Sequence, residues 1–278
     1  MKHKAIIIIV FLCSIISVNA QKQLDISYLE CSYRFTLMKD TIGKIKTVRS
    51  SDMRLLIGNK YSKFYSHTTF LSDSARTSKS RVEREKLFEN NAIGIIELLK
   101  QYPLDESYEI YKDYEKNTIV STDMIPPSNH VLYNEPIHKQ NWKILNETKQ
   151  IAGYNCQKAT CRFRGRNYEA WFTREIPVNE GPWKFNGLPG LIVKVYDIKE
   201  HYDFELYMVQ KVTKPIIFNY FEILDNIQYQ EISIKDYIKV KRNYIKNPYA
   251  GQSVTFRRSD GTEFIPQNLY DAIELDIK

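Results

Sequence analysis

The chain is poor in cysteine, histidine and glycine, with 4, 5 and 10 of them in 278 residues. The histidines His67, His130, His138 and His201 have no helical or hairpin spacing that would gather two of them on one ion, so we expect no metal and no cofactor. The catalytic motifs GxSxG and HExxH and a phosphate-binding glycine loop are missing too. Their absence weakens the case for an enzyme without excluding one, because many glycosidases and lyases lack short signatures.

A strong excess of one charge is also missing. The formal net charge is +7, and it falls to +5 once Lys2 and Lys4 are removed. The basic residues are dispersed along the chain rather than clustered, so we expect no nucleic-acid partner.

The first twenty residues have the three parts of an export signal. Lys2 and Lys4 precede an apolar core at 5–18, and small residues at 18–20 form a cleavage site before Gln21. The core is too short to remain as a membrane-spanning helix, and no later stretch is apolar enough to cross a membrane. We therefore expect a mature chain in the periplasm, at the outer-membrane periphery or outside the cell.

Three cysteines follow this signal, namely Cys31, Cys156 and Cys161. An oxidising compartment permits one disulfide among them. On an unbroken strand Cys156 and Cys161 would point to opposite faces, about 17 Å apart, which is too far for a bond. We expect a disulfide between Cys31 and either Cys156 or Cys161.

What the chain has in abundance is tyrosine and phenylalanine, 20 and 13 residues, and these favour strands. Polar and apolar residues alternate over 26–38, which predicts a strand whose apolar face holds Ser27, Leu29, Cys31, Tyr33, Phe35 and Leu37. Similar patterns predict strands at 53–57, 60–70, 108–114, 118–123, 131–133, 191–197 and 202–212, and several more between 142 and 172.

Two stretches have helical spacing, one at 82–100 and one at 234–245 with Ser233 as its cap. Between the strands and the first of these, the polar stretch 72–80 is typical of a mobile loop. No repeat or change in composition divides the chain. We predict one mainly β domain over 21–278, with a large curved antiparallel sheet like a half-barrel and one or two minor helices. The half-barrel carriers of the bacterial envelope offer an analogy at the level of fold alone.

Small, turn-forming residues stand out before the strand at 191–197. The six residues in question are Gly187, Leu188, Pro189, Gly190, Leu191 and Ile192. Glycine tolerates a positive φ and close backbone approach, and proline fixes its own φ, so they predict a buried bend. With ETKQIAGYNCQKAT at 147–160, FRGRNYEAWFT at 163–173 and EIPVNEGPWKF at 175–185, this region resembles the GLPGLI family of exported Bacteroidetes proteins. That family has no established activity, so the resemblance implies no catalytic residue.

Arg162, Arg164 and Arg166 alternate, so on a continuous strand their guanidinium groups share one face and suit an anionic ligand. The alternatives are a solvated face paired to carboxylates such as Glu169, or a hairpin turn near Gly165 that separates the arginines.

Trp183 and Phe185 lie in a long irregular connection, where they line a ligand site or fold inward to close the core. Glu169, Glu175 and Glu180 fall in or near it, and a pair of carboxylates can do acid-base work. Nothing in the sequence brings two of them together.

Thr41 and Ser74 lie in short motifs that resemble the O-glycosylation site of exported Bacteroidetes proteins. Overall we expect a non-enzymatic envelope protein that binds an amphipathic small molecule or an outer-membrane protein. The alternative is a secreted hydrolase or lyase that uses Glu or Asp beside the arginine row.

Overall fold

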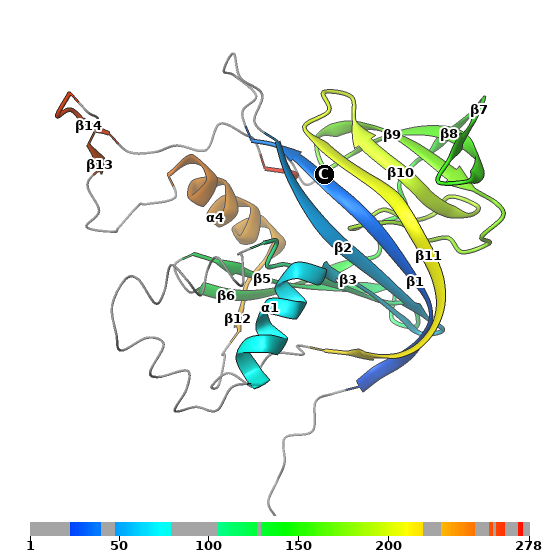
Figure 1. Cartoon of the computed structure of the whole chain (residues 1–278), viewed down its shortest axis with the longest axis horizontal. Helices are drawn as coiled ribbons and strands as arrows, with labels where there is room; N and C mark the ends of the chain where they lie inside the picture. Colours follow the sequence, from blue (N-terminus) through cyan, green and yellow to red (C-terminus); the bar gives the residue numbers. More distant parts are fainter. Residues whose placement is uncertain are drawn as a thin grey trace, which may run out of the picture.

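The fold was analysed in a computed structural model, which describes residues 23–39, 48–78, 105–126, 129–218, 229–247, 256–257, 260–264 and 272–274. Within them the chain is mainly β, as predicted, and forms a single domain around one open, curved sheet (Figure 1). The sheet has 12 strands in the order β12-β6-β5-β4-β3-β2-β1-β11-β10-β9-β8-β7. Its neighbours pair antiparallel, except for the parallel pair of β12 and β6.

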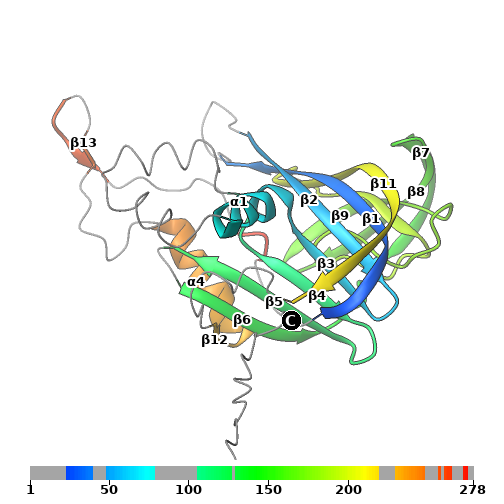
Figure 2. The same ribbon diagram turned by 60° about the horizontal axis from the view of Figure 1, so that its bottom comes forward.

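The strands of this sheet are β1 (Gln23–Met38), β2 (Val48–Gly58), β3 (Tyr61–Ser66), β4 (Glu109–Asp113), β5 (Thr118–Ile125), β6 (Asn129–Pro136), β7 (Lys143–Ile151), β8 (Tyr154–Phe163), β9 (Arg166–Thr173), β10 (Leu191–Asp197), β11 (Tyr202–Ile217) and β12 (Gln230–Glu231). A separate small hairpin joins β13 (Phe256–Arg257) and β14 (Glu263–Phe264). The helices are α1 (His67–Ser78) and α4 (Ile234–Lys246). Helix α1 packs against β2 and β3, and α4 packs against β6 (Figure 2).

Strand β1 buries the face that its alternation predicts, from Leu29 to Leu37. The opposite face is not simply solvated, because Glu30 and Ser32 are buried there as well. Glu30 accepts hydrogen bonds from Gln210 at 2.9 Å and from Lys214 at 2.5 Å. Partners on β11 thus allow a charged residue to be buried at a position that alternation alone assigns to the surface.

Two sequence predictions fail around α1. The predicted strand at 60–70 stops at Ser66, where β3 ends, and α1 begins at His67. The polar stretch predicted as a mobile loop is helical as far as Ser78. The predicted helix at 82–100 lies outside the described residues.

The predicted C-terminal helix is confirmed as α4. Ser233 caps it, because its side chain accepts a hydrogen bond from the backbone N–H of Asp236 at 3.1 Å. Tyr237, Ile238 and Ile245 form its buried face. Among the described residues, no helix has the length and apolar character needed to cross a membrane.

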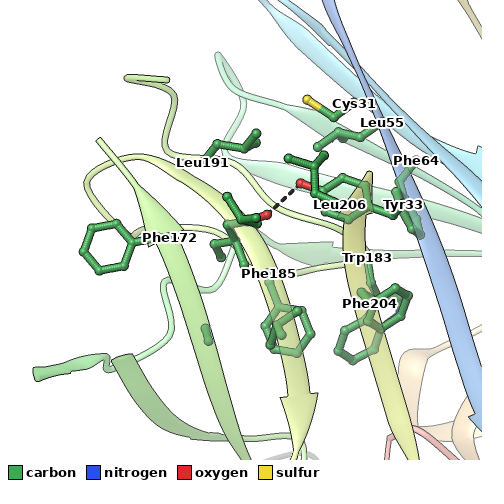
Figure 3. Packing of buried hydrophobic residues seen from close by; sticks show 14 of the residues in the cluster. Cys31, Tyr33, Leu55, Phe64, Phe172, Trp183, Phe185, Leu191, Phe204 and Leu206 are labelled. Atoms are coloured by element: carbon green, nitrogen blue, oxygen red, sulfur yellow. Dashed lines mark hydrogen bonds between the residues drawn. The ribbon is translucent and has the colours of Figure 1, made fainter. Parts of the chain in front are cut away.

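The main core joins buried side chains of β1 to β5 with those of β8 to β11 and of the loop before β10. Figure 3 shows Tyr33 and Phe204 in this core, with Trp183 and Phe185 of the loop packed beside them. The Tyr33 hydroxyl donates a 2.7 Å hydrogen bond to the carbonyl of Ile192. The loop is therefore a structural part of the core.

The bend from Gly187 to Ile192 is buried only in part: Leu188, Gly190 and the residues that begin β10 are buried, whereas Gly187 and Pro189 are exposed. Gly190 has a φ of 148°, and a Cβ there would lie 2.0 Å from the carbonyl oxygen of Thr173. Only glycine fits such a position. After the bend, the N–H of Ile192 donates a 2.9 Å hydrogen bond to the carbonyl of Glu180, which joins the start of β10 to the loop that precedes it.

Candidate functional site

A cavity of about 510 Å³ lies between the inner side of the sheet, α1 and α4. Its walls come from β1 to β6 and β11, from both helices, and from Trp183 of the loop before β10. A short C-terminal segment, residues 272–274, completes it. The cavity therefore gathers residues from distant parts of the sequence, from Phe35 to Glu274.

Aromatic side chains dominate its surface. Those lining it are Phe35, Tyr65, Phe70, Tyr108, Tyr133, Trp183, Tyr202, Tyr229, Tyr237 and Tyr244. Such rings offer flat apolar faces, and tyrosine adds a hydroxyl that can form hydrogen bonds. A ligand with both apolar faces and many hydroxyl groups suits this surface.

Acidic side chains are the second feature of the cavity. The carboxylates lining it are Asp73, Asp105, Glu106, Glu109, Asp123 and Glu274, and the cations are Arg49 and Lys241. Several carboxylates have cationic partners: Glu106 pairs with Arg49, and Glu109 pairs with Lys63 at 2.9 Å.

Asp105 differs from these because hydroxyl groups hold it. Ser51 of β2 donates a hydrogen bond to its Oδ1, and Ser66 at the end of β3 donates to its Oδ2 at 2.7 Å. Asp105 is partly exposed, and within the described part of the chain it has no cationic partner. It is thus an oriented, accessible carboxylate, which is what acid-base chemistry requires.

Asp123 is buried and links β5 to α4. Its Oδ2 accepts from the Tyr237 hydroxyl at 2.9 Å and from Lys241 at 2.6 Å, and its Oδ1 accepts from Ser107 at 2.6 Å. With these partners Asp123 holds α4 over the cavity. His130 also lines the cavity, and burial lowers its pKa, although Asp123 partly opposes this, so its ring is neutral at neutral pH.

A buried network of charges lies next to the cavity. Lys184 contacts Glu135 at 2.6 Å, Glu274 at 2.5 Å and the Tyr133 hydroxyl at 3.0 Å. Arg164 pairs with Glu135 as well. Burial would lower the pKa of Lys184, but Glu274, Tyr133 and Glu135 outweigh it and raise that pKa above its ordinary value. Lys184 is therefore a permanent cation in the buried network beside the cavity.

Trp183 immediately precedes Lys184 in the chain and has an unusual backbone conformation. It has a φ of 54°, which is uncommon for a bulky residue. The turn lets the Trp183 ring reach the cavity while the Lys184 side chain enters the network behind it. Strained backbone of this kind clusters at functional sites.

The predicted arginine row does not form. Arg164 and Gly165 both have positive φ values and make the tight turn between β8 and β9, so the strand is broken between the arginines. Arg162 is exposed, Arg164 joins the buried network, and Arg166 pairs with Asp197 at 3.2 Å. The expectation of one shared anion-binding face is wrong, because internal partners occupy the two buried guanidinium groups.

The other predicted site residues are dispersed. Trp183 lines the cavity, whereas Phe185 is fully buried in the core. Glu180 pairs with Lys112 at 2.7 Å, and Glu169 pairs with Lys158 at 2.9 Å on another part of the sheet. Glu175 accepts from the backbone N–H of Asn155 at 2.8 Å. The structure therefore does not pair these three carboxylates.

Cys31, Cys156 and Cys161 are all buried free thiols, so the predicted disulfide of Cys31 with Cys156 or Cys161 is not formed. Burial raises the pKa of Cys156 to about 11 and that of Cys161 to about 12, which keeps both thiols protonated at neutral pH. Among the described residues there is no group of three His, Cys, Asp or Glu that could hold a metal. Thr41 lies outside the described residues, and Ser74 lies in α1, so modification at either stays a prediction.

Comparisons with known proteins point to a different family from the one that residues 187–192 resemble. Residues 94–231 match a family model described as the N-terminal domain of an N-glycanase peptide. A comparison with curated proteins found no match.

Among solved structures, the chain is similar to PNGF-II in its C2 and P21 crystal forms, with TM-scores of 0.50 and 0.51. Sequence identity is 14% in both, and 85% of this chain is covered. The chain spans only 39% and 40% of those two chains. At this identity the likeness shows a common fold.

These findings correct the family resemblance drawn from residues 187–192. The matching model includes that motif but describes an N-glycanase domain, not the GLPGLI family. They also overturn the expectation of a non-enzymatic ligand-binding or outer-membrane accessory protein, and they favour the alternative of a hydrolase.

Sequence reasoning missed Asp105, Asp123 and Glu274. No spacing rule links them, because they come from a loop, a strand and the C-terminal segment. One signal was present for Asp123, which ends the predicted strand at 118–123 as a charged residue in an otherwise apolar and hydroxyl-bearing stretch.

Proposed function

We propose that this chain acts on N-linked glycans as a hydrolase and that the cavity is where the glycan binds. The observation that carries the proposal is the lining of the cavity, which combines many aromatic rings with oriented carboxylates. Sugar rings present apolar C–H faces to aromatic side chains and hydroxyl groups to carboxylates. The N-glycanase description of the family model that matches residues 94–231 supports this class of substrate.

Asp105 is the residue that we assign to acid-base chemistry. Its two serine partners fix the carboxylate plane while one lone pair on each oxygen stays available. In this role it takes a proton from the attacking water and returns one to the leaving group.

The test is the turnover of an N-glycopeptide by Asp105→Asn. The substitution keeps the shape of the side chain but removes its basicity, so kcat should fall by roughly 100-fold or more while KM stays within about threefold. Asp260→Asn is the matched control, because Asp260 is exposed and lies in the turn before β14. An Asp105→Asn variant with unchanged kcat would remove Asp105 from the mechanism.

Export to the envelope belongs to the same proposal. The basic start, apolar core and cleavage site within the first twenty residues support it, and the mature domain would then comprise 21–278. N-terminal sequencing of the exported protein should give Gln21 as the first residue. A retained Met1 would contradict export by this route.

A further inference from the structure

The C-terminal segment 272–274 is held by three hydrogen bonds, two from β9 and one from the loop before β10. Arg166 of β9 donates hydrogen bonds to the carbonyl of Ala272 at 2.7 Å and to that of Ile273 at 3.2 Å. Lys184 donates to Oε1 of Glu274 at 2.5 Å. All three residues of the segment line the cavity. A piece of chain distant in sequence is thus held as one wall of the candidate site.

Glu274 has spare hydrogen-bonding capacity in this wall. The residue is 3% exposed, and Lys184 binds its Oε1, with Nε of Arg164 at 3.8 Å from the same oxygen. Its Oε2 is buried and has no hydrogen-bond partner among the described residues. An ionised carboxylate accepts about four hydrogen bonds, and buried polar atoms of native proteins almost always have a partner. An unpartnered oxygen on a residue that lines a cavity points to a donor supplied by the ligand.

We propose that Glu274 is a specificity-determining residue of the cavity, whose Oε2 accepts a hydrogen bond from an O–H or N–H group of the bound glycan. This inference rests on the proposed function and assigns a contact within the same site. Lys184 and Arg164 act as positioning residues, because they hold the carboxylate through its other oxygen.

The network fits this role because it fixes the carboxylate before the ligand arrives. Lys184 is 1% exposed and contacts both Glu274 and Glu135, so neither its ammonium group nor the Glu274 side chain is free to move. A preorganised acceptor costs little ordering entropy on binding, and its charge strengthens the hydrogen bond. Ligands that lack a donor at this point would leave a buried carboxylate oxygen unpaired and would bind more weakly.

The variant that tests the proposal is Glu274→Gln. Its KM and kcat are measured with an N-glycopeptide as substrate, and its Kd is measured by titration with the same glycopeptide. Lys184 requires an acceptor, so the amide oxygen turns toward Lys184 and the amide NH₂ replaces Oε2. A donor then faces the donor of the ligand. We expect KM and Kd to rise by about tenfold or more, with kcat changed by less than about twofold, because loss of a charge-assisted hydrogen bond has that magnitude.

Glu135→Gln is the matched control. Glu135 belongs to the same buried network and contacts the same lysine, but it is not among the lining residues of the cavity. If Glu274 acts only through the charge of the network, both variants raise KM equally and the proposal is overturned. If Glu274 contacts the ligand, Glu135→Gln acts only indirectly through Lys184 and Arg164, and it raises KM by clearly less than Glu274→Gln does.

Glu274→Asp serves if Glu274→Gln does not fold. It keeps the negative charge but withdraws the carboxylate by one methylene, so KM should again rise, and an unchanged KM would overturn the proposal. A wild-type protein that binds the glycopeptide without cleaving it removes hydrolysis from the proposed function, and Kd then decides the role of Glu274. A wild-type protein that neither binds nor cleaves it contradicts both the proposed function and this inference. Normal turnover by folded Glu274→Gln contradicts the inference alone.

Discussion

At the scale of single residues, the two glycines of the bend before β10 carry different constraints. Gly187 has a φ of 87° and room for a methyl group, since a Cβ added there would lie 3.8 Å from its nearest neighbour, the side chain of Lys139, at ordinary van der Waals distance. Gly190 combines a φ of 148° with the carbonyl oxygen of Thr173, which would lie only 2.0 Å from an added Cβ. The first glycine is needed for its backbone conformation, and the second for its conformation and for space.

We therefore predict that Gly187→Ala lowers the free energy of unfolding by about 1–2 kcal/mol, the cost of a left-handed conformation. Gly190→Ala should lower it by more than about 3 kcal/mol or prevent soluble expression, since Thr173 or the whole bend has to move. Chemical denaturation of both variants measures the difference. Equal losses would mean that the close contact with Thr173 does not determine the role of Gly190.

At the scale of elements, α4 depends on contacts near its start. Ser233 caps its first turn, and Tyr237 and Lys241 bind Asp123 beneath it. Ser233→Ala removes the acceptor for the N–H of Asp236 and should cost about 1 kcal/mol of stability. Lys239→Ala, an exposed change on the same helix, should stay within about 0.5 kcal/mol of wild type. Thermal unfolding followed by circular dichroism compares the two, and a larger loss for Lys239→Ala would refute the capping role.

Strands and helices could be predicted where the spacing of apolar residues in the local sequence determines them. The alternation in β1, the apolar run of β10 and the capped spacing of α4 are visible in the sequence because each depends on neighbouring residues. The change from strand to helix at His67 could not be predicted, because residues 60–70 are rich in strand-forming side chains.

The site was hidden for a different reason. Arg162, Arg164 and Arg166 looked like a functional row because their spacing is regular, yet a turn separates them. Asp105 and Glu274 have no local signal, and their roles arise only when β2, β3 and the loop before β10 bring their partners into contact. Tertiary contacts of this kind cannot be read from spacing in one sequence.

At the scale of the whole molecule, the curved sheet contributes both to the main hydrophobic core and to the cavity. One part is filled by the core around Tyr33 and Phe185, and the other remains open as the cavity beneath α1 and α4. Trp183 belongs to both, since it packs in the core and lines the cavity. The loop before β10 thus connects the stability of the sheet to the shape of the site.

We propose that this cavity binds and hydrolyses an N-linked glycan. It is tested by mass spectrometry of one N-glycopeptide after incubation with the protein, beside calorimetric titration with the glycopeptide and with the same peptide lacking its glycan. We expect the mass of the glycan to be released and only the glycosylated peptide to bind. An intact glycopeptide, together with equal or absent binding of the two peptides, would contradict it.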